Sequence, residues 1–404
     1  MAQFRIEDTI DLSRMRRERV EKVRDRMKRD GIGALLCFHP DNIQYLTDVS
    51  GGMVRSLPTA RNVLFPRTGD PLLFEWGNRY WRIRDELAPW LKGKVYHGWR
   101  LGQYLGAGIY PQEFIDDLKK RLGEHDVLNE PLGIDIPIVT LGLPEIFKKA
   151  GIKPVDGGGI LLDVRKIKTV DEIECQRIAS SICDQLFSAI QEAIRPGIRE
   201  SELQAIGAEA ALRMGCDTPP ELVLCSGENT SPNMGGFSNR PVKWGDLIFI
   251  DPALVEWRGY HVCYYRTFVC GKATVKQKDL YRKNLDLLRK AMAKVKAGAT
   301  TADICKQWPG HEYWGLKSWF EGPEIAVGHG IGLGIQEGPI ITPLFSLEHP
   351  VPLEENMVIA LETWLSSGDH PKQAVRVEET VVVKKDGYEL LTSWPIEEVT
   401  EAWR

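Results

Sequence analysis

Gly328-His329-Gly330-Ile331-Gly332-Leu333-Gly334 places one histidine among four glycines, between two apolar runs. Glycine has no β-carbon, so the backbone can turn tightly here and come close to whatever His329 faces. A histidine that only filled a core would not need such neighbours. The stretch therefore predicts a backbone that positions His329 for chemistry.

Three acidic residues accompany this histidine in predicted strands. Asp251 closes an apolar strand, and Glu362 and Glu378 lie within later strand-like segments. An unpaired carboxylate in a buried strand is costly. We therefore expect Asp251, His329, Glu362 and Glu378 to share one polar catalytic pocket.

The length, net charge and cysteine content of the chain limit the class of protein to which it can belong. A chain of 404 residues should form two or three domains at about 150 residues each. The net charge of −4 is small and dispersed, which gives no reason to expect nucleic acid or a membrane surface as a partner. No apolar run approaches the roughly 20 residues of a membrane span. The eight cysteines are scattered without a C-x-x-C pair, which is typical of reduced thiols and predicts a cytoplasmic protein.

The element pattern changes near the middle of the chain. Up to the glycine run at 156–159, helical and strand-like segments alternate, which predicts an α/β domain over 1–158. A long helix over 169–194 then begins a region in which helices followed by strands occur twice. We expect this second domain, 159–404, to be α+β and to hold the site.

Several motifs of this region resemble those of the pita-bread superfamily, which contains creatinase, prolidase, aminopeptidase P and methionine aminopeptidase. They are Ile167-Lys-x-x-Asp-Glu-Ile, Cys225-Ser-Gly-Glu-Asn, Gly245-Asp-Leu-Ile-Phe-Ile-Asp, Gly259-Tyr-x-x-x-x-x-Arg-Thr-Phe, Gly328-His-Gly-Ile-Gly-Leu and Val375-Arg-Val-Glu-Glu-Thr-Val. The first domain resembles the creatinase-type N-terminal domain, most visibly in Pro40-x-Asn-Ile-x-Tyr-Leu-Thr. The resemblance is strongest to the group with bacterial dimethylsulfoniopropionate-cleaving lyases. It implies a pita-bread catalytic domain, a small-molecule substrate and a homodimer.

The resemblance also implies a ligand set from which this chain departs. Family peptidases hold two divalent metals with two aspartates, a histidine and two glutamates. The position of the second aspartate falls at Cys263, and a further aspartate of the lyases falls at Ala253. Without the bridging carboxylate, two adjacent cations would repel each other with little compensation.

Two interpretations of the cofactor stay open. One divalent ion, Zn or Fe, could be held by Cys263, His329, Glu362 and Glu378, because thiolate, imidazole and carboxylate form a sensible site for either metal. A metal-free pocket, as in creatinase, is equally defensible. His329 would then act as the general acid or base.

Five further residues are candidates for substrate binding. His261 and Tyr265 should share a strand face with Cys263 by the period of two. Asn233 falls near a histidine of the peptidases, Arg376 could pair with a carboxylate, and Trp364 could hold a cation or a ring.

These departures favour a non-peptidase enzyme that cleaves a C–N bond as a hydrolase, or a C–C or C–S bond as a lyase, in a small polar catabolic substrate. One alternative is an Xaa-Pro dipeptidase with a single metal. Another is a catalytically inactive binding or scaffold protein, although a scaffold has no need to bury Glu362 and Glu378.

Overall fold

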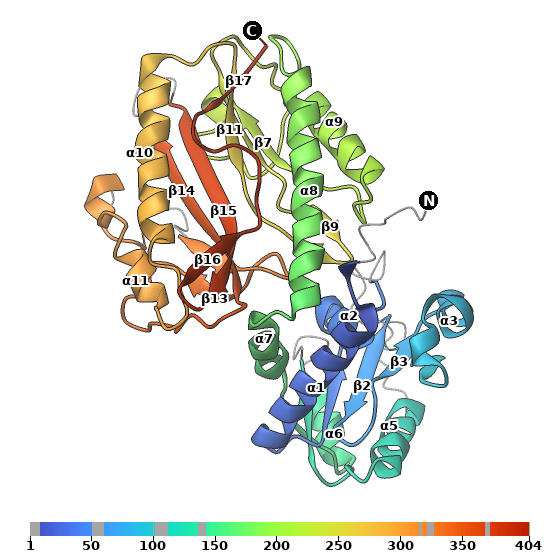
Figure 1. Ribbon diagram of the computed structural model, residues 1–404. Helices are drawn as coiled ribbons and strands as arrows, with labels where there is room; N and C mark the ends of the chain where they lie inside the picture. The colour runs from blue at the N-terminus through green and yellow to red at the C-terminus, as the bar shows by residue number, and fades with distance from the viewer. Residues whose placement is uncertain are drawn as a thin grey trace. The chain divides into compact units, whose positions relative to one another are not determined.

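The computed structural model describes residues 9–50, 60–99, 101, 112–135, 143–314, 317–320, 327–367 and 372–403. The chain forms two compact units, one from Asp11–Arg165 and one mainly from Lys166–Arg404 (Figure 1). The predicted architecture of an α/β unit followed by an α+β unit is confirmed.

The N-terminal unit is built on one six-stranded mixed sheet in the order β4-β3-β2-β1-β5-β6. Its helices and strands are α1 (Leu12–Asp30), β1 (Ala34–Cys37), α2 (Pro40–Thr47), β2 (Asn62–Pro66), β3 (Leu72–Glu75), α3 (Arg79–Arg82), β4 (Val95–His97), α5 (Gln112–Glu124), β5 (Pro131–Ile134), α6 (Leu143–Lys149), β6 (Lys153–Asp156) and α7 (Gly158–Lys166). β1 pairs antiparallel with β2 and parallel with β5, and all four of its residues are buried. It is therefore a central strand of this unit.

Helix α1 shows how the sequence sets an element. Its N-cap Asp11 accepts the backbone N–H groups of Ser13 and Arg14, which the first turn leaves without helical partners. Gly31 ends the helix with φ of 68°, a left-handed conformation that glycine adopts without strain. The caps thus account for both ends of this helix.

The C-terminal unit contains two larger sheets and a short two-stranded ribbon. The larger sheets run β17-β11-β8-β7 and β13-β12-β14-β15-β16. The elements are α8 (Val170–Ala193), α9 (Glu200–Arg213), β7 (Val223–Ser226), β8 (Leu247–Asp251), β9 (Glu256–Trp257), β10 (Tyr260–His261), β11 (Arg266–Cys270), α10 (Val275–Met292), α11 (Thr301–Cys305), β12 (Gly328–Gly330), β13 (Glu337–Ile341), β14 (Val358–Ser366), β15 (Ala374–Lys384), β16 (Gly387–Leu390) and β17 (Thr400–Ala402).

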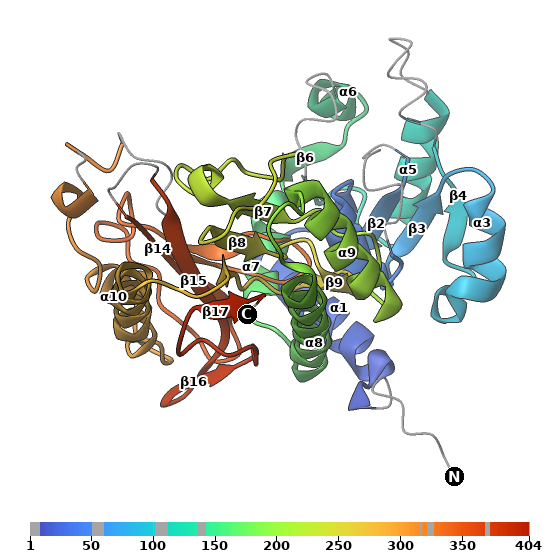
Figure 2. The ribbon, with the colours of Figure 1, turned by 90° about the horizontal axis from the view of Figure 1, so that it is seen from above.

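Different helices pack against each of these two sheets. Residues of α8 and α9 form one apolar core with β7, β8 and β11, and residues of α10 form a second core with β14 and β15. Figures 1 and 2 show α8 and α10 running beside the strands of this unit. Each sheet thus packs against its own helices through apolar side chains.

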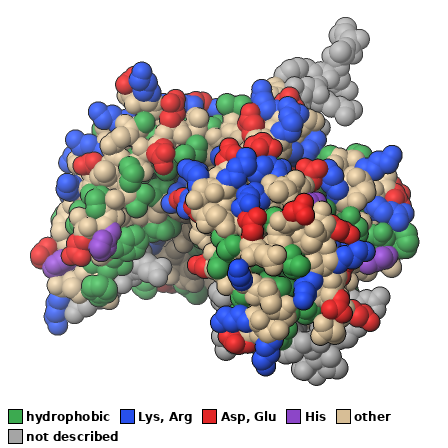
Figure 3. Space-filling model, turned by 90° about the horizontal axis from the view of Figure 1, so that it is seen from below, with side chains coloured by type: hydrophobic (Ala, Val, Ile, Leu, Met, Phe, Trp, Pro, Cys, Tyr) green, Lys and Arg blue, Asp and Glu red, His purple; other side chains and the backbone are tan. Residues whose placement is uncertain are grey.

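The surface of the molecule mixes both signs of charge. Figure 3 shows basic and acidic side chains interspersed over one face, in keeping with the net charge of −4. In the described part of the chain, no helix combines the length and the apolar character that a membrane crossing requires.

Candidate active site

The two predicted glutamates face each other across a pair of antiparallel strands. Glu362 of β14 and Glu378 of β15 are direct partners in the register. Trp364, two residues after Glu362, and Arg376, two residues before Glu378, are also partners. Because side chains alternate between the faces of a sheet, all four lie on one face.

His329 lies on β12, which pairs with β14 on one side and β13 on the other. The register with β13 shifts between His329 and Gly330, an irregularity of the kind that often re-aims a side chain beside an active site. A β-carbon at Gly330 would collide with the backbone oxygen of Gly338, so only glycine fits there. His329 is 3% exposed.

One ring nitrogen of His329 has a partner in the backbone. Nδ1 lies 2.9 Å from the carbonyl oxygen of Gly330. Nδ1 must carry the hydrogen in this contact, because a carbonyl oxygen only accepts. The neutral imidazole then keeps a lone pair on Nε2, as a ligand or a general base requires.

Cys263 lies between two of the predicted acids. Its Sγ is 3.4 Å from Oε2 of Glu378 and 3.8 Å from Oδ1 of Asp251, at the end of β8. Asp251 is held by the backbone N–H of Ala253, which donates to Oδ1 at 3.0 Å. The predicted catalytic residues thus lie near one another, but Glu362, which is also a predicted metal ligand, lies outside the group of donor atoms formed by Cys263, His329 and Glu378.

The cluster gathers negative charge where water is scarce. Burial, and next the charge of Glu362, raise the pKa of Asp251 to about 7. Burial, followed by the charges of Glu362 and Asp251, raises the pKa of Glu378 well above its usual range. Burial and the neighbouring carboxylates, with burial first, also raise the pKa of the Cys263 thiol. These groups therefore resist ionising together unless a cation lies among them.

Tyr265 contacts both glutamates. Its hydroxyl donates to Oε2 of Glu362 at 2.9 Å, and its backbone N–H donates to Oε2 of Glu378 at 3.1 Å. The other carboxylate oxygen of Glu378, Oε1, is buried without a hydrogen-bond partner. Tyr265 therefore positions the two acids, and the substrate contact predicted for it stays a prediction.

The other predicted substrate residues fall in two places. The Nε2 atom of His261 lies 3.5 Å from Oε2 of Glu256, which gives this histidine an acidic neighbour. Asn233, Trp364 and Arg376 line a cavity of about 830 Å³. For all of them, a contact with substrate stays a prediction.

Nothing in the sequence marks two lysines of this cavity as candidate site residues. Lys283 of α10 and Lys372, just before β15, belong to its lining. Neither lies in a motif, and both adjoin ordinary polar residues. Only the packing of α10 against the sheet could have revealed that Lys283 belongs here.

Three donor atoms of the site are arranged as a metal site requires. Cys263, His329 and Glu378 each offer one ligand atom, all buried, and these atoms lie within 4.8 Å of one another. The orphaned Oε1 of Glu378 and the crowded carboxyl groups also favour a positive charge at this point. The residues present therefore fit one divalent cation.

Comparisons with known proteins agree with this geometry. The model for metallopeptidase family M24 matches residues 174–385, and the creatinase/prolidase N-terminal domain matches residues 19–167. An Xaa-Pro dipeptidase from Pyrococcus horikoshii is 30% identical over 274 residues, which cover 65% of this chain and 72% of that protein. Dimethylsulfoniopropionate lyase DddP from Roseobacter denitrificans is 23% identical, covering 96% of this chain and 88% of that protein. The solved structure of an Xaa-Pro dipeptidase from Bacillus anthracis has a TM-score of 0.75 at 23% identity, covering 95% of this chain and 99% of that one.

These findings correct one prediction. The replacement of a peptidase ligand by Cys263 favours a non-peptidase enzyme, but the relatives at 30% identity are named Xaa-Pro dipeptidases. The physical reason is that one altered ligand changes how a cation is held, whereas His329 and both glutamates remain for the hydrolytic reaction. The match to more than half of the chain shows that it belongs to metallopeptidase family M24 and carries a creatinase/prolidase N-terminal domain.

Proposed function

We propose that this chain is a peptidase that hydrolyses the bond between the first residue and proline in a short peptide, using one divalent cation. The observation that carries the proposal is the convergence of buried donor atoms from Cys263, His329 and Glu378. The Xaa-Pro dipeptidases among its relatives support the choice of bond. The resemblance also supports a homodimer, and that state stays a prediction.

Cys263, His329 and Glu378 would hold the cation. Thiolate and imidazole are ligands that Zn and Fe accept, and a coordinating thiol gives up its proton despite a raised pKa. When bound, the cation supplies Lewis-acid polarisation of the scissile carbonyl. A second cation has little support, because the thiol at Cys263 cannot bridge two hard cations as a carboxylate does.

The remaining acids handle protons and the substrate. The Tyr265 hydroxyl holds the Glu362 carboxylate beside Glu378. Glu362 can then take a proton from the attacking water and return it to the leaving nitrogen. We assign to Asp251, the acid at the end of β8, the binding of the substrate's ammonium group. The backbone carbonyl of Gly330 keeps the His329 ring in one tautomer.

Assaying matched dipeptides tests the reaction. We expect the protein loaded with Zn, Fe, Mn or Co to hydrolyse Ala-Pro and to leave Pro-Ala intact, with activity lost after dialysis against a chelator. Product release measured by chromatography is the readout. Absence of Ala-Pro hydrolysis with all four metals would refute the proposed function.

Metal analysis tests the ligand set separately from turnover. We expect one equivalent of metal per chain, and a cobalt-loaded protein with an absorption band of thiolate-to-cobalt charge transfer. Cys263→Ser should remove this band and weaken metal binding at least about tenfold, because a soft ligand is lost. Cys270→Ser provides the matched control, since Cys270 is a buried thiol outside the cluster. Two equivalents of metal, or an unchanged band in Cys263→Ser, would show that the ligand assignment is wrong.

A further inference from the structure

The cavity beside the glutamates is lined by charges of one sign. Its charged lining residues are Lys283, Lys372 and Arg376, and no acidic side chain belongs to the lining among the described residues. The rest of the lining is polar or apolar: Thr230, Ser231, Pro232, Asn233, Leu280, Tyr313, Trp364, Leu365, Ser366 and Ser367. A concave surface with one sign of charge concentrates ligands of the opposite sign.

None of these three basic side chains forms a close ion pair with a described acidic residue, although the charge of Arg376 acts on Asp251 from a longer distance. No ion pair within 4.0 Å involves Lys283, Lys372 or Arg376 among the described residues. The Arg376 guanidinium instead lies over the rings of Phe249 and Trp364, with its centre 5.0 and 5.9 Å from their centroids. Its Nε atom is buried without a hydrogen-bond partner. A buried donor in this state is costly unless a ligand completes it.

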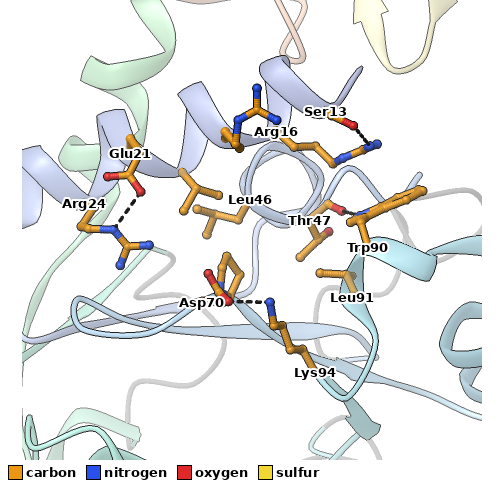
Figure 4. Close-up of a pocket in the computed structure, with 13 residues that line it drawn as sticks. Ser13, Arg16, Glu21, Arg24, Leu46, Thr47, Asp70, Trp90, Leu91 and Lys94 are labelled. Carbon is orange, nitrogen blue, oxygen red and sulfur yellow. Dashed lines mark hydrogen bonds and ion pairs between the residues drawn. The ribbon is translucent and has the colours of Figure 1, made fainter. Parts of the chain in front are cut away.

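The pocket of the N-terminal unit makes the contrast clear. Figure 4 shows that cavity, of about 290 Å³, with Arg24 contacting Glu21 and Lys94 contacting Asp70. The Arg16 guanidinium there pairs with Asp48. Arg16, Arg24 and Lys94 of that pocket thus each have an acidic partner, whereas Lys283, Lys372 and Arg376 form no ion pair within 4.0 Å among the described residues.

The position of the cavity relates it to the proposed reaction. Arg376 and Trp364 form the next pair on the same strand face, two residues before Glu378 and two residues after Glu362. Two residues of strand span roughly 6.6 Å, about the length of one or two residues of a bound peptide. A group held by Lys283, Lys372 and Arg376 would therefore lie within one or two peptide residues of the glutamate pair.

We infer that this cavity binds the carboxylate-bearing end of the substrate and selects peptides with an acidic residue after the proline. Three basic side chains carry more positive charge than is required to neutralise one terminal carboxylate. A cavity of about 830 Å³ also has room for more than a single proline. The planar arginine fork between aromatic rings matches a carboxylate. The inference rests on the proposed peptidase function for the identity of the substrate.

A binding experiment tests the inference without any turnover. Calorimetry on the chelator-treated protein would compare Pro-Glu with Pro-Gln, which differ in one negative charge and represent the leaving part of Xaa-Pro-Glu and Xaa-Pro-Gln. We expect Pro-Glu to bind roughly tenfold more tightly in low salt, with the preference falling as salt screens the charges. The double variant Lys283→Gln/Lys372→Gln should bind the two peptides equally.

Lys290→Gln is the matched control for the double variant. Lys290 is an exposed lysine of the same helix outside the cavity lining, so its loss should keep the full preference for Pro-Glu. Equal binding of the two peptides by the wild-type protein, or an unchanged preference in the double variant, would overturn the inference. Tighter binding of inorganic phosphate than of Pro-Glu would overturn the assignment to a carboxylate. Because no hydrolysis is involved, a negative Ala-Pro assay leaves this result interpretable.

Discussion

Replacing His329 with alanine is expected to lower kcat/KM for Ala-Pro about a thousandfold or more. The substitution removes the imidazole whose Nε2 lone pair completes the donor set with Cys263 and Glu378. A cation that polarises a carbonyl contributes several kcal/mol, and about 4 kcal/mol corresponds to a factor of a thousand in rate. Steady-state kinetics and metal analysis of the same sample are the measurements.

The two readouts distinguish a lost ligand from a misfolded protein. His329→Ala should retain its circular dichroism spectrum while its metal content falls well below one equivalent. His349→Ala is the matched control, because His349 is exposed and belongs to no donor cluster among the described residues. Activity of His329→Ala within tenfold of the wild-type value would remove His329 from the chemistry.

Much of this site could be predicted because its residues lie in strands with clear patterns. His329 among glycines, and Glu362 and Glu378 in apolar strands, are conspicuous in the chain alone, and the sheet places them together. The alternation of side chains along the strands gives the two glutamates their common face. The ends of α1 are likewise set by its own caps.

The rest depends on contacts between distant segments. Lys283 reaches the cavity only because α10 packs on β14 and β15, and no local pattern marks it. The hydroxyl of Tyr265 meets Glu362 across 97 residues of sequence, so its positioning role could not be predicted from spacing. The reaction class is hard to predict for a different reason. One substituted ligand at Cys263 is conspicuous, but it says less about the reaction than the histidine and acids that remain.

The glycine-rich stretch has a further buried support that the sequence does not reveal. Nζ of Lys168 and Oε2 of Glu337 are 2.9 Å apart, with side chains 1% and 2% exposed. Oε1 of Glu337 also accepts the backbone N–H of Gly334. A β-carbon at Gly332 would come within 2.9 Å of both side chains, so this glycine gives the ion pair its room. The pair thereby anchors the turn that follows His329.

Lys168→Met is accordingly expected to lower the free energy of unfolding of the C-terminal unit by about 3–5 kcal/mol, because it leaves the Glu337 carboxylate buried without its cation. Denaturant unfolding followed by tryptophan fluorescence measures the loss. The double variant Lys168→Met/Glu337→Leu should recover most of it, since the uncompensated charge is then gone and the contacts still missing, such as the hydrogen bond to Gly334, are worth about 1 kcal/mol each.

Lys384→Met is the matched control for this prediction. Its partner Glu389 lies 3.0 Å away, but both side chains are more than one-third exposed, so the cost should stay below about 1 kcal/mol. If Lys168→Met cost no more than Lys384→Met, the buried pair would contribute nothing special to stability. If it does cost more, metal affinity should fall in the same variant, because the turn that the pair anchors continues directly from the strand that carries His329.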